Sequence, residues 1–143
     1  MSDKPVRKPG PNASPVTKPF WDGAREHRLL LQHCDHCRRA VFYPRHRCPS
    51  CWSDALSWHE ASGAGTVASH ITVHRPAHPA FLEEAPYNVA LIDLAEGPRM
   101  LSNVVDCAPE EIYVGMPVAV RYRDQGDTTV PVFYPLTREA ERP

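Results

Sequence analysis

Four cysteines form two C-x-x-C pairs separated by ten residues. They are Cys34, Cys37, Cys48 and Cys51. Two thiolates three positions apart on a tight turn can bind one metal ion, and the intervening residues can form a hairpin that returns the second pair. This spacing is typical of a tetrathiolate zinc ribbon. Because four sulfurs complete a tetrahedral site, we expect Zn²⁺ to organise structure here and to leave no position for water or substrate.

Disulfides, iron and redox chemistry are the alternatives for these cysteines. Disulfides need an oxidising compartment, whereas residues 1–19 carry charges and prolines where a secretory signal has an apolar stretch. A thioredoxin-type site needs one C-x-x-C at a helix start, but here there are two, with Pro49 inside the second. The nearby histidines, which four thiolates make redundant as ligands, are His33, His36 and His46. The unpaired Cys107 is expected to be a small buried hydrophobe.

The composition argues against a membrane protein and against a general nucleic-acid binder. The chain has 143 residues and no apolar run as long as a membrane span. We therefore expect a soluble, cytoplasmic protein. Residues 1–19 carry four basic side chains and one acidic one, so of the whole-chain charge of −1 the remainder carries −4. A nucleic-acid binder usually presents a basic body.

The pattern along the chain predicts a mainly β fold. A short helix is expected from Pro19 to about His27, followed by a ribbon strand that runs from Leu29 into the first cysteine pair. Alternation and turn residues then predict five strands, with a helical turn at 108–115 between the third and the fourth. The expected strands are 66–74, 87–94, 99–105, 117–124 and 130–136. This order is that of an OB-type barrel.

The predicted organisation has four parts. They are a disordered, proline-rich tail (1–18), a short helix with a rubredoxin-like zinc ribbon (19–62), a five-stranded OB-fold barrel (63–137) and a C-terminal tail (138–143).

Several motifs together resemble one known family. They are FWDGAREHRLLLQHC, the C-x-x-C-x10-C-x-x-C array, the YPR between the cysteine pairs, the SGAGTV exit and the strand GMPVAVRY. This ordered set is similar to the thiolase-associated zinc-ribbon and OB-fold family, formerly described as a domain of unknown function. The resemblance covers residues 20–136.

The resemblance implies an accessory subunit without catalytic residues of its own. Members of that family partner a thiolase-superfamily enzyme or a related hydratase and help to bind or position acyl-CoA. The catalytic partners include thiolases, enzymes like 3-hydroxy-3-methylglutaryl-CoA synthase and steroid side-chain aldolases. The resemblance therefore implies a part in an acyl-CoA complex that forms or cleaves C–C bonds, expected as a heterotetramer. One departure is that glycine commonly follows each cysteine pair in the family, whereas Arg38 and Trp52 stand there in this chain.

Four arginines crowd around the cysteine pairs. They are Arg38, Arg39, Arg45 and Arg47. Guanidinium groups bind phosphate oxygens in a bidentate way, so this cluster is a candidate contact for the phosphates of CoA. The simpler interpretation is a solvated face that offsets the formal charge of about −2 on a tetrathiolate zinc centre. Both interpretations remain open at the level of sequence.

The sequence offers little for catalysis and a few candidates for partner contact. It contains no G-x-S-x-G, H-E-x-x-H, P-loop or Rossmann glycine pattern. Phe20 and Trp21, on the predicted helix, are candidates to face a core or a partner. Phe81 lies in a long proline-rich loop of the kind that often contacts partners. We propose these three aromatic residues as interface residues.

Three classes of function compete. The leading hypothesis is the accessory subunit that docks on a thiolase-like enzyme and helps to enclose acyl-CoA. The alternative is a single-stranded nucleic-acid-binding protein, because zinc ribbons and OB barrels both recur in such proteins. An independent small enzyme has almost no support from individual residues.

Overall fold

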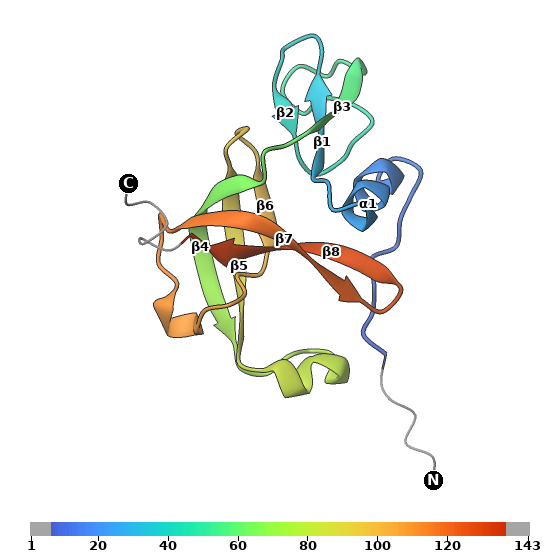
Figure 1. Cartoon of the computed structure of the whole chain (residues 1–143). Coiled ribbons are helices and arrows are strands. Elements are labelled where there is room, and N and C mark those ends of the chain that lie inside the picture. Colours follow the sequence, from blue (N-terminus) through green and yellow to red (C-terminus); the bar gives the residue numbers. More distant parts are fainter. Residues whose placement is uncertain (1–6, 137–143) are drawn as a thin grey trace.

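The computed structural model describes residues 7–136. It shows a small three-stranded sheet above a larger curled sheet, with one helix beside their junction (Figure 1). The small sheet contains β1 (Leu30–Cys34), β2 (Ala40–Val41) and β3 (Leu56–Glu60), in the antiparallel order β2-β1-β3. No helix among the described residues is long and apolar enough to cross a membrane.

Helix α1 (Lys18–Arg25) begins with a proline in its first turn, as the sequence predicts. It ends because His27 adopts a positive φ of 59° and the N–H of Arg28 donates to the carbonyl of Gly23 over 2.8 Å, which is a Schellman-type stop. Phe20 and Ala24, one turn apart, are buried on the same face. The helix therefore packs one apolar stripe against β1 and β8.

The large sheet has five antiparallel strands in the order β6-β5-β4-β7-β8. They are β4 (Ala64–Val73), β5 (Tyr87–Leu94), β6 (Arg99–Ser102), β7 (Pro117–Gln125) and β8 (Thr128–Pro135). Val104, just after β6, forms a parallel bridge with Phe133 of β8. This bridge brings the two edges of the sheet together, so the sheet is curled as in an OB-fold. Two short 3₁₀ helices, η1 (Pro79–Glu84) and η2 (Pro109–Glu111), lie in the connections.

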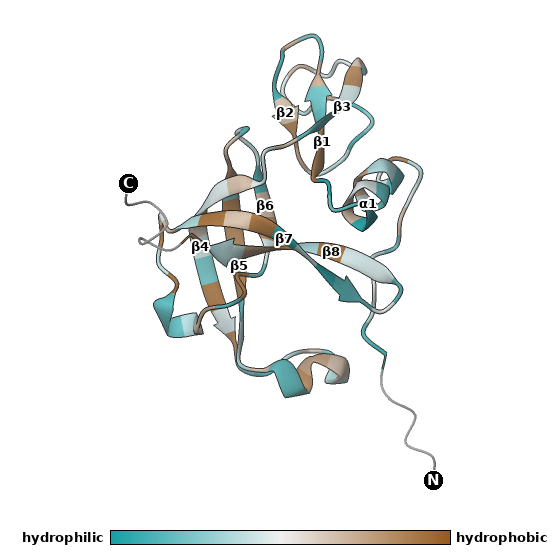
Figure 2. Ribbon diagram, in the orientation of Figure 1, coloured by the Kyte–Doolittle hydropathy of each residue, from teal (hydrophilic) through white to brown (hydrophobic). Residues whose placement is uncertain are grey.

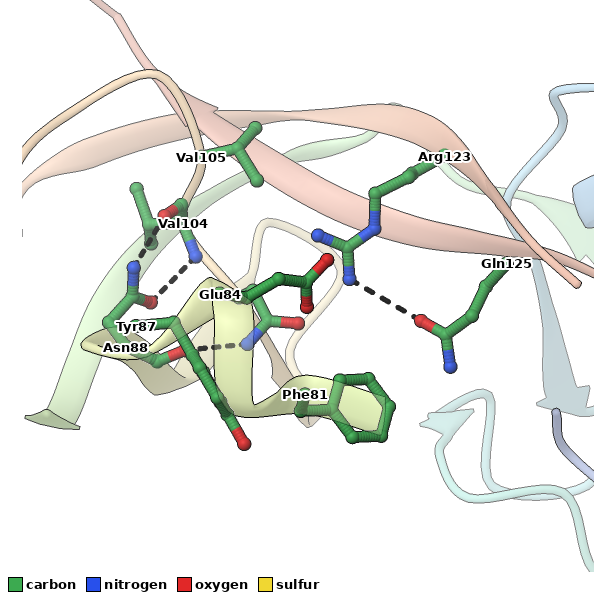
Figure 3. Close-up of a pocket in the computed structure, with 9 residues that line it drawn as sticks. Phe81, Glu84, Tyr87, Asn88, Val104, Val105, Arg123 and Gln125 are labelled. Atoms are coloured by element: carbon green, nitrogen blue, oxygen red, sulfur yellow. Dashed lines mark hydrogen bonds between the residues drawn. The ribbon is translucent and has the colours of Figure 1, made fainter. Parts of the chain in front are cut away.

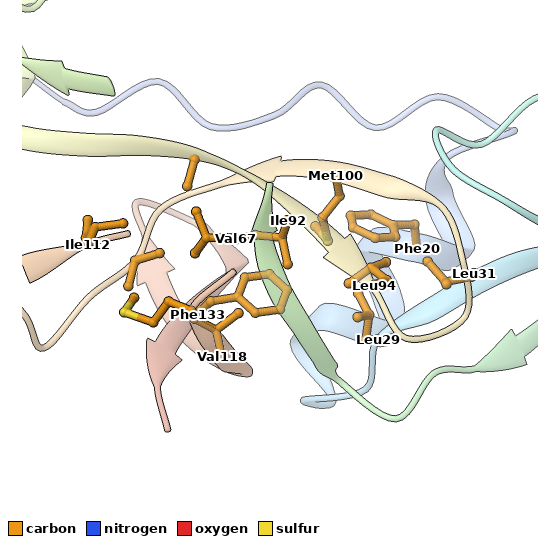
Figure 4. Packing of buried hydrophobic residues seen from close by; sticks show 13 residues of the cluster. Phe20, Leu29, Leu31, Val67, Ile92, Leu94, Met100, Ile112, Val118 and Phe133 are labelled. Carbon is orange, nitrogen blue, oxygen red and sulfur yellow. The ribbon is translucent and has the colours of Figure 1, made fainter. Parts of the chain in front are cut away.

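The strands of the large sheet carry both hydrophobic and hydrophilic residues along their length (Figure 2), and buried and partly exposed residues alternate regularly in β5. In β5 every second residue from Asn88 to Leu94 is buried. The core continues from the barrel, at Ile92 and Phe133, to Phe20 and Leu31 at the base of the ribbon (Figure 4). Ribbon, helix and barrel thus share one hydrophobic core.

Two elements differ from the sequence-based prediction. β3 was not expected, because SDALSWHEA lacks a clear apolar alternation; it forms by pairing along the whole of β1. η1 occupies part of the loop expected between the first two barrel strands, where the ring Nδ1 of His78 accepts a hydrogen bond from the N–H of Ala80 over 3.1 Å.

The structure describes part of the N-terminal tail that was expected to be disordered. Residues 7–12 lie beside the β7–β8 turn, where Nε2 of Gln125 donates to the carbonyl of Pro9 over 3.0 Å. Lys8 forms an ion pair with Glu84 of η1. Residues 1–6 and the whole C-terminal tail expected at 138–143 lie outside the described part of the chain.

Candidate metal centre

The four cysteine sulfurs converge at the tip of the ribbon. Cys34 ends β1, and the other three lie on the two turns that follow. The Sγ atoms of Cys34 and Cys51 are 3.5 Å apart, those of Cys37 and Cys48 are 3.6 Å apart, and all four lie within 4.8 Å of one another. Zinc–sulfur bonds of about 2.3 Å in a tetrahedron place sulfurs about 3.8 Å apart. The residues therefore fit a tetrahedral Zn²⁺.

The sulfurs are held as metal ligands are. The N–H of Cys37 donates to the sulfur of Cys34 over 3.4 Å, and Ser50 does the same for Cys48. Such donors stabilise a thiolate. Cys34 and Cys48 are fully buried, so solvent does not reach these two sulfurs.

The pKa values of the thiols show why a cation is needed. The N–H of Cys37 lowers the pKa of Cys34, against the effect of burial. Burial raises the pKa of Cys48, but the N–H of Cys51 helps to bring it down to about 6. The pKa of Cys51 rises to about 12, because burial and the sulfur of Cys34 outweigh the N–H of Ser53. Four thiolates this close therefore need a divalent cation to offset their repulsion.

Both cysteine turns have the same backbone geometry. The N–H of Arg38 donates to the carbonyl of Cys34 over 2.7 Å, and that of Trp52 donates to Cys48 over 2.9 Å. Arg38 and Trp52 have φ values of 64° and 65°. These are the positions at which the family resemblance predicts glycine, and in this chain non-glycine residues adopt a left-handed conformation there.

The candidate phosphate-binding arginines surround this centre and are all exposed. They are Arg38, Arg39, Arg45 and Arg47. Nη1 of Arg39 reaches Ser50 Oγ over 3.4 Å, and Nη1 of Arg47 donates to the carbonyl of Trp52 over 3.1 Å. Within residues 7–136 none of the four forms an ion pair, unlike Arg28, Arg99 and Arg121. Their charges face solvent beside the metal centre.

An aromatic hollow of about 440 Å³ lies between α1, the segment that follows β2, and the barrel strands β6, β7 and β8. Its aromatic residues are Phe20, Trp21, Phe42 and Tyr43. The ring centroids of Phe20 and Trp21 lie 4.8 Å apart at nearly a right angle. Phe20 itself is only 2% exposed, because its ring packs into the core, so in this structure it lines the hollow from inside and is not a surface residue.

Trp21 and Leu101 face this hollow differently from Phe20. The indole Nε1 of Trp21 is buried and has no hydrogen-bond acceptor among the described residues. Leu101, on the neighbouring edge strand β6, is 63% exposed. Sequence reasoning missed Leu101, although the alternation in RMLS, with Met100 buried, was the signal that placed it outward.

A second hollow, of about 530 Å³, lies between η1 and the end of β7 (Figure 3). Phe81 lines it and is half-buried, with the ammonium group of Lys8 5.7 Å from the centre of its ring. Its neighbour Leu82 is a large hydrophobic residue that is exposed in this loop. In the same view Glu84 points toward Arg123, whose Nη2 lies 3.5 Å from Oε1 of Gln125. The structure does not bring Phe81 to the aromatic hollow of Trp21.

Fold and site together define a protein with a four-cysteine ribbon joined to an OB-fold barrel. Comparison with family models gives the same division: residues 21–57 match "ChsH2, rubredoxin-like zinc ribbon domain" and residues 58–123 match "ChsH2, C-terminal OB-fold domain". The chain belongs to this DUF35 family of ChsH2-type zinc-ribbon and OB-fold proteins.

Three similar proteins illustrate the range of the family. A probable enoyl-CoA hydratase alpha subunit of Thermomonospora curvata is 41% identical over 124 residues, which are 85% of this chain and 38% of the relative. A DUF35 domain-containing scaffold protein of Methanocaldococcus jannaschii is 35% identical over 77% of this chain and 81% of its own length. The solved structure of an Ltp2-ChsH2(DUF35) aldolase matches with a TM-score of 0.80 and 38% identity, over 88% of this chain and 98% of the other.

The chain spans well under half of the hydratase alpha subunit. It covers nearly all of the ChsH2(DUF35) chain and most of the scaffold protein.

Proposed function

We propose that the chain is a zinc-binding, non-catalytic accessory subunit that docks on a thiolase-superfamily enzyme and helps to bind or position acyl-CoA. The observation that carries this proposal is the match, over 98% of its length, to the DUF35 chain of an aldolase assembly. A chain of the same fold and extent in an enzyme complex supports a role as a subunit. The thiolase identity of the partner follows from the sequence resemblance.

Zn²⁺ bound by Cys34, Cys37, Cys48 and Cys51 is the cofactor of this proposal. When bound, it offsets half of the negative charge of the four thiolates and cross-links the two turns of the ribbon. The cysteines fill all four tetrahedral positions, so the ion has none to offer a substrate. The residues of the ribbon thereby hold a surface in place, and bond-making or bond-breaking belongs to the partner.

The aromatic hollow is the proposed docking surface. Leu101 and Tyr43 expose apolar area at its rim, at 63% and 46% of their surfaces. The N–H of Trp21 is a buried donor without an acceptor in the described chain, and a carbonyl or carboxylate of a partner would satisfy it. Apolar area around one unsatisfied donor is typical of the centre of a protein interface.

The arginines beside the metal centre are the proposed contact for the phosphates of CoA. They have no carboxylate partner within residues 7–136 and stand on a surface that the zinc centre would hold rigid. Arg39 directly precedes β2 and Arg45 follows it, so the two exposed guanidinium groups come from different connections of the ribbon.

Purification of the full chain from its own cells tests the proposal. We expect a thiolase-superfamily enzyme to co-purify in equal amount, with a light-scattering mass of two copies of each chain. Recovery of the chain as a monomer would contradict the proposal, as would salt-sensitive binding to single-stranded oligonucleotides without such a partner.

The CoA contact needs its own test in the purified complex. Replacing Arg39 and Arg45 with alanine should weaken CoA binding about tenfold or more, because two charge-assisted contacts are lost. Arg99→Ala, which removes an arginine paired with Asp93 on the barrel, is the matched control and should not alter CoA affinity. Equal affinity of the double variant and the control would remove the phosphate contact.

A further inference from the structure

A second group of metal-binding side chains lies on the outer face of the ribbon sheet. His33 and Asp35 are two positions apart at the end of β1, and His59 lies on the adjacent strand β3. His33 pairs with Ser57, so His59 is its diagonal cross-strand neighbour on the same face. Successive residues of a strand point to opposite faces, so Cys34 faces the other way, into the tetracysteine cluster.

The three side chains are close enough to share one ion. One donor atom from each lies within 4.8 Å of the other two. Nδ1 of His33 is 3.6 Å from Oδ1 of Asp35, and the two imidazole centroids are 4.7 Å apart. Ligand bonds of about 2.0–2.2 Å in a tetrahedron place nitrogen and oxygen donors about 3.4 Å apart. Small side-chain rotations would therefore complete three corners of a tetrahedron.

One of these donors lacks a hydrogen-bond partner. Nδ1 of His33 is buried from solvent, and no hydrogen bond reaches it from any described residue. A buried polar atom of this kind needs an explanation, and a bound ion is one. Ser57 adds a supporting contact, because its Oγ donates to Asp35 Oδ1 over 2.8 Å and lies 3.0 Å from Nε2 of His59. This hydroxyl holds the carboxylate beside the imidazole ring.

The location leaves room for a further ligand. His33 and His59 both line a hollow of about 230 Å³, whose wall also includes Glu96 in the turn between β5 and β6. Three protein donors leave at least one coordination position open, in contrast to the four cysteines.

We propose that His33, Asp35 and His59 form a second metal site that takes a divalent transition-metal ion such as Zn²⁺, Co²⁺ or Ni²⁺. Two imidazoles and one carboxylate are the donor set these ions prefer, whereas Mg²⁺ and Ca²⁺ prefer all-oxygen sites. The site is separate from the tetracysteine centre and independent of the proposed role as an accessory subunit.

A calorimetric titration tests this proposal. The full chain is first loaded with one equivalent of zinc and is then titrated with ZnCl₂. We expect one further equivalent to bind. His59→Ala and Asp35→Asn should each weaken this second step about tenfold or more and leave the first equivalent in place. His46→Ala removes an exposed ribbon histidine outside the group and should titrate like the unaltered chain.

Spectroscopy with Co²⁺ separates a lost site from a lost fold. Co²⁺ added to the zinc-loaded chain should give the weak visible bands of a nitrogen and oxygen site, without the intense sulfur charge-transfer absorption of a thiolate site. His33→Gln should abolish these bands while the tetrathiolate zinc is retained. Failure of the zinc-loaded, unaltered chain to bind a further equivalent, or unchanged titration of the His59 and Asp35 variants, would overturn the proposal.

Discussion

At the scale of single residues, the left-handed backbone conformation in the two cysteine turns is unfavourable in free energy for a non-glycine residue. Trp52 has a φ of 65° and its side chain is 73% exposed, so the side chain gains little packing for its conformation. A non-glycine residue in this region costs roughly 1–2 kcal/mol.

Replacing Trp52 with glycine should therefore stabilise the ribbon. We expect Trp52→Gly to be about 1 kcal/mol more stable than Trp52→Ala, because both lose the indole and only alanine keeps the strained Cβ. Thermal unfolding of the zinc-loaded variants measures the difference. Equal stabilities, or a less stable glycine variant, would show that the turn relaxes without glycine.

Gly23 is required for a different reason, which is space. A Cβ at this position would lie 2.8 Å from Cγ of Leu30 and 3.0 Å from the carbonyl oxygen of Arg28. The backbone atom cannot move aside without disturbing the end of α1.

Gly23→Ala should lower the free energy of unfolding by about 1–3 kcal/mol, despite the better helix propensity of alanine. Arg25→Ala, at an exposed position of the same helix, is the control and should change stability by less than about 0.5 kcal/mol. Urea unfolding compares the two. A stabilised Gly23 variant would mean that helix and β1 are packed less tightly than the structure shows.

At the scale of elements, the sequence predicted the barrel better than the ribbon. The strand expected at 87–94 coincides with β5, because its apolar alternation follows from burial of one face. β3 could not be predicted, since its residues are mixed and its partner β1 lies more than twenty positions away. The cysteine spacing predicted the metal cluster because local turns bring each pair together. Burial of Phe20 depends on the packing of α1 against β1 and β8, which spacing does not encode. The outward position of Leu101, in contrast, follows from the alternation of burial along β6.

The buried side-chain amide of Asn88 links β5 to the segment that directly follows β6. Asn88 on β5 donates from Nδ2 to the carbonyl of Val104 and accepts the N–H of Val104 at Oδ1 over 2.8 Å. Val104 also forms the bridge to Phe133 that closes the sheet.

Asn88→Ala should cost about 2–4 kcal/mol, because it leaves both backbone groups of Val104 buried without a partner. Asn88→Asp keeps the acceptor for the N–H but replaces the donor with a carboxylate oxygen that faces the carbonyl of Val104, so it should also be destabilising. Urea unfolding measures the stability of both variants. Thr72→Ala, at the half-buried cross-strand neighbour of Asn88, is the control. If Asn88→Ala lowered the free energy of unfolding no more than Thr72→Ala, this would contradict the role of the Asn88 amide in closing the sheet.

At the scale of the whole molecule, the ribbon and the barrel share a core through Phe20 and Leu31, yet the sulfur cluster lies beyond this core with few apolar neighbours. Such a small cluster cannot stabilise the tip of the ribbon by burial alone, so its order depends on the metal. Loss of zinc should disorder the cysteine turns and leave the barrel folded. Under the proposed function, zinc therefore acts by keeping the docking subunit folded and not in the chemical step.

The most direct measurement of the central claim follows the mass of the complex and its turnover together while a chelator removes zinc. If the chain is a docking subunit, light scattering should show the complex dissociating as zinc is lost, and the remaining turnover should fall in proportion to the intact complex. Loss of turnover while the complex keeps its full mass would contradict the account, because the metal centre would then act on the chemical step itself.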